Sequence, residues 1–437
     1  MTPEARSLPA PVRRVTGLAR AGGIAIIDQG TISLSNFLTS VIVARSVDLH
    51  GFGLFTLALT VLFAGNAFQG ALVTGPLNVL IAGRDDEGRR RFTAGIGLIQ
   101  VGLIVVLAAL ALLAAVAGDA EVAPVALAVA VTAVGWQTQE FARRVLYVEE
   151  RFPDAFANDV LSYGGQVVAC AALASAGAMT PATALLAIGL TSLGAGLLGL
   201  WAVRHRLSAR PVMADVVMSL RHGVWLAAGE VAQVVTGRLP AFLLAAFVAV
   251  TASGILGAAL LVLNPLNVVL FSISSLLPMR LARVRAEQGE EAASRLLRRT
   301  HLITTPPVVA FCIIAAILGE FLLDLLYDNR YLGYGWLVAL IALFSVLRFH
   351  STLVIAGLWS KRLSRSIFVG QLVGAIVALG AGVALVASIG LAGAVLAMIT
   401  ATAVSIVIWW LLYLRGGMNG EAAAPSVEPG PAAVSPA

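Results

Sequence analysis

Residues 93–117, TAGIGLIQVGLIVVLAALALLAAVA, contain no charged side chain and one amide, Gln100. As a helix this segment would rise about 38 Å at 1.5 Å per residue. That length exceeds the roughly 30 Å hydrocarbon core of a bilayer, so the segment is typical of a transmembrane helix. Comparable apolar blocks of similar length recur along the whole chain.

The composition agrees with a membrane protein. The 437 residues are 59% hydrophobic and 12% charged, with a mean hydropathy of +0.93. Soluble globular chains are about 45–50% apolar and about 25% charged. Aromatic residues make up 7%, and no stretch shows the short alternating segments of an outer-membrane barrel. The sequence therefore predicts an all-α polytopic membrane protein and excludes an ordinary soluble one.

Twelve transmembrane helices fit the pattern, six in each half of the chain. The predicted spans are 18–45, 52–82, 93–117, 122–148, 155–176, 181–203, 222–248, 251–279, 300–325, 334–360, 364–387 and 390–414. This pattern predicts an N-terminal segment 1–17, an N-lobe 18–204, a loop 205–221, a C-lobe 222–415 and a tail 416–437. The tail is rich in Ala, Pro, Gly and Ser, a composition that favours disorder.

The positions of the basic residues predict the topology. All 29 lie at the termini or on alternate connections, except Arg45, Arg238, Arg330 and Arg348. The positive-inside rule then places both termini in the cytoplasm. This explains the net charge of +6 without a nucleic-acid partner. The first apolar block is too long for a cleavable signal peptide and is interpreted as a retained span.

The two halves match each other at a shift of 201 or 202 residues. The matching pairs are Asp28 with Glu230, Asn36 with Arg238, Gly53 with Gly254, Asn66 with Asn267 and Pro76 with Pro278. Because each half contains six spans, both halves have the same orientation. Parallel repeats of this kind occur in transporters whose substrate site lies between two bundles. The repeat predicts two pseudo-symmetric six-helix lobes around a central cavity, with alternating access.

Polar residues inside the spans are candidates for the wall of that cavity. An ionisable residue in a span costs about 2.5–3.5 kcal/mol on insertion scales, so it usually faces protein or water. The polar stripes of the first and seventh spans, which begin at Asp28 and Glu230, are repeat partners and are expected to face the same cleft. The candidate substrate-binding residues are Asn36, Asn66, Gln69, Gln233, Arg238, Asn264, Asn267 and Arg348.

Two interpretations of the charged residues stay open. Arg238 and Arg348 lie deep in spans with few acids nearby, which suits an anchor for phosphate or diphosphate, because arginine binds such groups bidentately. Asp28 and Glu230 could carry a coupling ion. Alternatively the groups satisfy one another, with Glu230 paired to Arg238 and Asp28 paired to a neighbouring helix.

Two further basic sites have local explanations. Glu140, Arg143 and Arg144 have the i,i+3 and i,i+4 spacings of ion pairs on one helix. They are interpreted as a structural or gating group. Arg45, near the outer end of the first span, is expected to extend to the lipid headgroups.

No catalytic constellation is visible in the sequence. The five histidines are isolated without metal-ligand spacing, and no phosphate-binding glycine loop is present. Cys170 and Cys312 each lie inside a span and are interpreted as inert. The chain is therefore predicted to be no enzyme and to need no cofactor or metal. Every external connection is expected to be short, roughly ten residues or fewer, which disfavours a membrane-embedded glycan polymerase or ligase.

Several segments together resemble a known family. They are SNFLT (35–39), AR (44–45), GFGLF (51–55), QEFARR (139–144), NPLN (264–267), LP (277–278) and LRF (347–349). The chain resembles the polysaccharide exporters, or lipid-linked oligosaccharide flippases, of the multidrug/oligosaccharidyl-lipid/polysaccharide (MOP) superfamily. The resemblance implies a bacterial inner-membrane protein that moves a polyprenyl-diphosphate-linked oligosaccharide, such as an O-antigen, capsule or exopolysaccharide repeat unit, to the outer leaflet.

The resemblance also implies partners and leaves alternatives. Membrane lipids, a polysaccharide polymerase or glycosyltransferases are the expected partners. A cation-coupled multidrug exporter of the same superfamily is the main alternative. Two deep arginines disfavour it, because they make the cavity repel organic cations. A non-catalytic scaffold is disfavoured by the repeated polar cleft.

Overall fold

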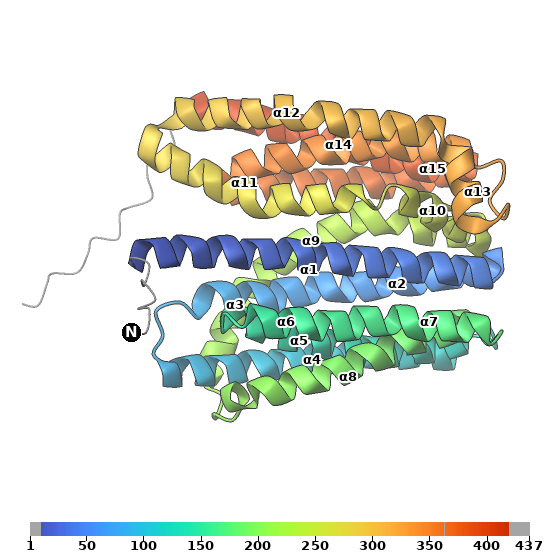
Figure 1. Cartoon of the computed structure of the whole chain (residues 1–437). Coiled ribbons are helices and arrows are strands. Elements are labelled where there is room, and N and C mark those ends of the chain that lie inside the picture. The colour runs from blue at the N-terminus through green and yellow to red at the C-terminus, as the bar shows by residue number, and fades with distance from the viewer. Residues whose placement is uncertain (1–9, 362, 419–437) are drawn as a thin grey trace, which may run out of the picture.

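The computed structural model describes residues 10–361 and 363–418, and within them the chain is helical without strands (Figure 1). The first eight elements are α1 (Ala10–Ser46), α2 (Leu49–Gln69), η1 (Gly70–Thr74), α3 (Gly75–Leu80), α4 (Asp86–Ala117), α5 (Val122–Val148), α6 (Phe152–Asp159) and η2 (Val160–Gly164). The others are α7 (Gly165–Ser175), α8 (Pro181–Leu207), α9 (Met213–Phe247), α10 (Val250–Val262), α11 (Leu266–Gln288), α12 (Glu290–Ile317), α13 (Gly319–Tyr327), α14 (Gly335–Ser360) and α15 (Ser364–Met418).

These elements make twelve passages across the molecule. Nine helical segments of the described residues are long and apolar enough to cross a membrane, and α15 among them crosses twice, because Ile389 and Gly390 interrupt it. Helix α1 and the interrupted segment α6–η2–α7 make the other two passages. The π-helices η1 and η2 lie within single passages, as does the break between α10 and α11. The predicted all-α class with twelve spans is confirmed.

Two predicted boundaries differ from the structure. The expected loop 205–221 is mostly helix, because α8 continues to Leu207 and α9 begins at Met213. The first turn of α9 docks on the N-lobe through Asp215, whose Oδ1 lies 2.8 Å from Arg84 Nη2. At the termini, 10–17 belongs to α1 and 416–418 to α15, while the rest of the predicted segments 1–17 and 416–437 lies outside the described residues.

The helices form two lobes that meet along a central plane. Helices α1–α8 build the N-lobe and α9–α15 the C-lobe, with α9 passing from beside the N-lobe into the C-lobe (Figure 1). Helix α1 begins, and α15 ends, on the same side of the molecule, here called the terminal side. The opposite side, where α1 ends and α2 begins, is called the far side.

The lobes are sealed together at the far side by a close approach of α2 and α10. A Cβ atom on Gly53 would lie 2.2 Å from the carbonyl oxygen of Val250, and one on Gly254 would lie 2.8 Å from the nitrogen of Gly53. Real side chains do not tolerate such contacts, so only glycine permits this packing. Gly53 and Gly254 are repeat partners, and they touch each other across the interface between the lobes.

Helix α13 adds a second far-side contact that the sequence analysis did not anticipate. The predicted span 300–325 is divided in the structure, because α12 ends at Ile317 and the separate helix α13 follows it and reaches across to the N-lobe. Arg45 donates from Nε to Leu326 O (2.7 Å) and from Nη2 to Leu325 O (2.6 Å). The expectation that Arg45 extends to headgroups is therefore wrong. A cation at the last carbonyls of a helix also interacts favourably with the helix dipole.

An aromatic cluster fills the space behind this contact. The rings of Phe52 and Tyr331 meet edge to face at 6.4 Å, and Tyr331 lies 4.8 Å from the ring of Tyr327. Both tyrosines are at most 1% exposed. Burial raises the pKa of Tyr331, so its phenol stays neutral at physiological pH. The far-side seal therefore combines glycine packing, aromatic packing and the hydrogen bonds that Arg45 donates to α13.

Adding a side chain at the seal should open it. We expect Gly53→Leu to destabilise the sealed state by about 1–3 kcal/mol through overpacking. A change of about 1.4 kcal/mol shifts the ratio of open to sealed molecules tenfold. The measurement is labelling of a cysteine at Ser33, in a Cys170→Ala/Cys312→Ala background, by an impermeant thiol reagent in whole cells. Gly102→Leu is the control, because a Cβ there meets nothing within 4 Å. Equal labelling rates in both variants would contradict the seal.

Candidate functional site: a cavity between the lobes

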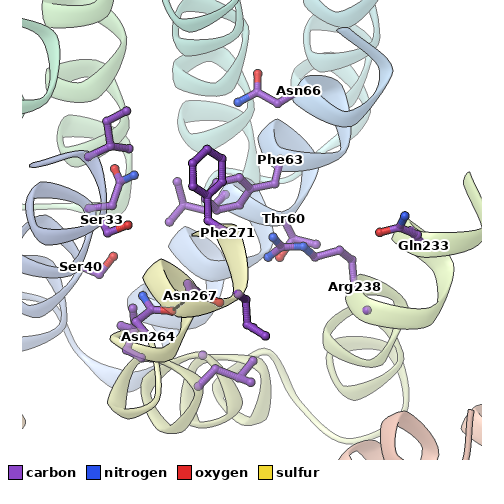
Figure 2. A pocket seen from close by; sticks show the side chains of 18 of the residues that line it. Ser33, Ser40, Thr60, Phe63, Asn66, Gln233, Arg238, Asn264, Asn267 and Phe271 are labelled. Carbon is purple, nitrogen blue, oxygen red and sulfur yellow. Dashed lines mark hydrogen bonds between the residues drawn. The ribbon is translucent and has the colours of Figure 1, made fainter. Parts of the chain in front are cut away.

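A cavity of about 790 Å³ lies between the two lobes, on the terminal side of the seal (Figure 2). Its volume is in the range of about 300–1,000 Å³ that is usual for small-molecule sites. Phe52 and Ser253 line its far-side end, and the walls continue to Thr74 and Ser274 towards the terminal side. The cavity receives side chains from helices of both lobes, as the repeat predicts.

All eight residues predicted to bind substrate line this cavity. They are Asn36, Asn66, Gln69, Gln233, Arg238, Asn264, Asn267 and Arg348. The predicted gating residues Glu140, Arg143 and Arg144 line it as well. Asp28 and Glu230 do not line it, although their spans were expected to present them there.

Arg238 and Arg348 are the unpaired charges of the cavity. Both are exposed, although each lies deep in the molecule, because their surface faces the cavity. Arg238 extends from α9 towards α2, where its guanidinium carbon lies 4.6 Å from the ring centroid of Phe63 (Figure 2). Such a cation–π contact contributes about 0.5–2 kcal/mol. Neither arginine forms an ion pair with any described side chain.

Glu230 lies in an adjoining cavity of about 440 Å³, which is lined mostly by the C-lobe and also by Phe63 and Ala67 of α2. Gln371 and Trp409 line this second cavity, and Arg238 and Arg348 line both cavities. Glu230 forms no ion pair with Arg238 within 4 Å, so the mutual pairing considered from the sequence is absent among the described side chains. The two arginines therefore stand between a carboxylate on one side and the central cavity on the other.

Amide groups occupy much of the remaining polar wall. Asn267 donates from Nδ2 to Asn264 Oδ1 (2.9 Å), and these two residues keep further polar capacity towards the cavity. Asn66 accepts from Gln137 Nε2 (2.8 Å). Gln69 is only 1% exposed, and its Nε2 donates to Gln100 Oε1 (2.9 Å). Gln69 is therefore held mainly by the N-lobe interior rather than free for a ligand.

The N-lobe side of the cavity carries a network of charges centred on Arg143. Its Nη2 lies 3.0 Å from Asp28 Oδ2, its Nη1 2.9 Å from Glu140 Oε2 and its Nε 2.6 Å from Asp159 Oδ2. Asp28 and Asp159 are completely buried. Arg144 binds Glu140 as a second cation, with 2.6 Å between Nε and Oε1. Asp28 thus pairs with a neighbouring helix, one of the two alternatives drawn from the sequence.

The sequence analysis missed two residues of the site. Asp159 is a carboxylate near the start of the predicted span 155–176, and its position inside an apolar block was a usable signal. Its carboxylate is also held by Gln139, whose Nε2 donates to Asp159 Oδ1 at 2.6 Å. Phe63 carries no such signal, because a phenylalanine in a membrane span is ordinary until its neighbour Arg238 is known.

The fold is shared by solved transporters and flippases. A multidrug resistance MATE family transporter of the MOP superfamily, in an inward-facing conformation, matches with a TM-score of 0.72 at 13% identity, covering 90% of this chain and 96% of that one. The lipid II flippase MurJ, in an inward closed conformation, matches with a TM-score of 0.69 at 10% identity, covering 89% and 87%.

A third structure of the same fold is instructive for its cavity. It is a MOP superfamily transporter from Pyrococcus furiosus, matched with a TM-score of 0.65 at 14% identity over 91% of this chain and 95% of that one. The reverse polarity of the binding pocket of that transporter suggests a different function for it. No functionally curated protein matches the sequence.

The two lobes, the cavity and these matches show that the chain has the fold of these membrane transporters and of the lipid II flippase. The sequence profile described as "Polysaccharide biosynthesis protein" matches residues 42–334. The chain belongs to that family. The resemblance stated from the sequence is confirmed.

Removing the central cation of the N-lobe network should destabilise the protein. We expect Arg143→Gln to cost about 3–5 kcal/mol, because Asp28 and Asp159 would remain buried without a cation. The measurement is thermal unfolding of the purified protein in detergent. Arg144→Gln is the matched control, since Glu140 keeps its contact with Arg143. A melting temperature of Arg143→Gln equal to that of the control would contradict the structural role.

Proposed function

We propose that the protein moves a polyprenyl-diphosphate-linked oligosaccharide from the inner to the outer leaflet of a bacterial inner membrane. The observation that carries the proposal is that Arg238 and Arg348, in a cavity between two lobes, form no ion pair with any described side chain. Family membership supports a role in polysaccharide biosynthesis. The lipid II flippase of the same fold supports a lipid-linked substrate.

The charge of the cavity favours an anionic substrate group. Among the described residues, four arginines and a single carboxylate, Glu140, supply its charged lining, and Glu140 is already bound by Arg143 and Arg144. Arg238 and Arg348 thus remain for the diphosphate, which guanidinium groups bind by charge-assisted bidentate hydrogen bonds. Within a low-dielectric site such bonds are stronger than in water.

The rest of the wall suits the sugar units. Asn264, Asn267 and Gln233 offer neutral donors and acceptors that match hydroxyl groups. Phe271 also lines the cavity, with an exposed ring (Figure 2). In this arrangement the diphosphate is held by charge, and the glycan is held by hydrogen bonds and contact with a ring face.

The same geometry supports alternating access. With the far side sealed, the cavity receives substrate from the terminal side, which the positive-inside rule assigns to the cytoplasm. Separation of Gly53 from Gly254 would then open the cavity to the opposite side. A polysaccharide polymerase or glycosyltransferases would act before or after this step as partners of the pathway.

Multidrug export is the competing function, because a multidrug resistance transporter shares the fold. The four arginines of the lining argue against organic cations as cargo. An excess of positive charge in a confined cavity repels them.

The first experiment is deletion of the gene in its host, followed by leaflet assignment of polyprenyl-linked glycans. We expect a complete lipid-linked unit to accumulate on the cytoplasmic leaflet, with loss of surface polysaccharide. Unchanged lipid-linked glycans together with increased drug sensitivity would contradict the flippase function and support multidrug export.

Replacing the arginines should abolish transport without removing the protein from the membrane. We expect Arg238→Gln and Arg348→Gln each to weaken binding of a diphosphate-linked lipid about 10- to 100-fold, since a hydrogen bond to a charged group contributes about 1.5–3 kcal/mol. Binding to purified protein and export in the deletion strain are measured together. Arg91→Gln, on the terminal surface, serves as the control. Wild-type export by the double variant would refute the diphosphate anchor.

Glu230 is the candidate for ion coupling, whereas Asp28 is engaged by Arg143. If a cation or proton bound at Glu230 drives transport, Glu230→Gln should remove the dependence of export on the ion gradient. The readout is export by inside-out vesicles with and without the gradient. Retained gradient dependence in Glu230→Gln would leave Glu230 with a structural role.

A further inference from the structure

The hairpin formed by α11 and α12 carries a second basic site, separate from the central cavity. The two helices meet at Gly289, whose φ of 87° lies in the left-handed region that glycine adopts without strain. Figure 1 shows the hairpin on the terminal side of the C-lobe. A pocket of about 490 Å³ is lined by Val284, Gln288, Ala292, Arg295, Leu296, Arg298, Arg299 and Leu302.

The pocket has an uncompensated positive charge. Arg295, Arg298 and Arg299 are exposed, and none of them forms an ion pair with a described side chain. No carboxylate lines the pocket within the described part of the chain. Glu290, on the first turn of α12, is engaged by Arg285 and by Lys361, whose Nζ lies 2.9 Å from Glu290 Oε1.

The position of the arginines matches the surface of the membrane. From Leu302 onwards the outer face of α12 exposes apolar side chains, with Leu302 69%, Ile303 59% and Ile317 76% exposed. Leu302 and Ile317 lie about 23 Å apart along the helix. This length fits within the hydrocarbon core of about 30 Å, so the face contacts acyl chains. The three arginines lie at its terminal-side end, at the level of the headgroups.

We propose that this pocket binds an anionic phospholipid of the terminal-side leaflet. The phosphate contacts Arg295, Arg298 and Arg299, and an acyl chain follows Leu302 along α12. Arginine binds phosphate oxygens bidentately, and basic pockets on the cytoplasmic side are suited to anionic headgroups. An acidic soluble protein would satisfy the arginines but would leave the adjoining apolar face unused. The site does not depend on what the central cavity carries.

The test measures which lipids stay bound to the full-length protein when it is released from bilayers of defined composition, and it compares the wild type with a variant of the pocket. Native mass spectrometry counts bound cardiolipin, phosphatidylglycerol and phosphatidylcholine after release from the same nanodiscs. We expect the wild-type protein to retain the anionic lipids selectively. The variant Arg295→Gln/Arg298→Gln/Arg299→Gln should lose about tenfold or more of this retention.

A control variant removes the same charge elsewhere on the terminal side. Arg90→Gln/Arg91→Gln/Arg210→Gln replaces three exposed arginines outside the pocket and should retain the lipid as the wild type does. If the triple variant is unstable, the single variants Arg295→Gln and Arg299→Gln are compared in the same way.

Three results would overturn the proposal. The first is equal retention of cardiolipin by the pocket variant and the wild type. The second is complete displacement of the lipid by equimolar inorganic phosphate, which would make the site one for the free anion. The third is that an acidic protein co-purifies with the wild type but not with the pocket variant, while the variant retains as much lipid as the wild type.

Discussion

A charged group inside a membrane protein must either be paired or face water, because the hydrocarbon core offers it neither a counter-charge nor a hydrogen-bond partner. The two lobes meet this constraint in opposite ways. In the N-lobe, Arg143 is surrounded by three carboxylates, two of them completely buried. In the C-lobe, Arg238 and Arg348 lack ion-pair partners among the described side chains and are exposed to the cavity. The polar cavity is what makes these two charges tolerable.

The same sequence repeat therefore has two different uses. Asp28 and Glu230 are repeat partners by position, yet Asp28 is turned into the N-lobe towards Arg143, while Glu230 lines the second cavity. Gly53 and Gly254, by contrast, retain the same role and contact each other across the interface. The backbone symmetry is preserved where the lobes touch, and the side-chain chemistry has diverged where they enclose the cavity.

Helix α9 connects the state of one lobe to that of the other. Its first turn is held on the N-lobe by Asp215 and Arg84, its middle presents Arg238 to Phe63, and its end belongs to the C-lobe. Arg238, which lines the central cavity, therefore lies on the helix that contacts both lobes.

The membrane class, the twelve passages, the repeat and the deep arginines could all be predicted from the amino-acid sequence. These features depend on hydropathy, spacing and the cost of intramembrane charge, which are local properties of the chain. Which polar groups meet depends instead on how the helices pack. This packing paired Asp28 and Asp159 with Arg143, left Glu230 apart from Arg238, and turned Arg45 to the carbonyls of α13. The partners of Asp28 and Arg45 lie more than a hundred residues away in sequence, and the rotation of each helix decides which side chains meet them, so the period of a single span predicts neither contact.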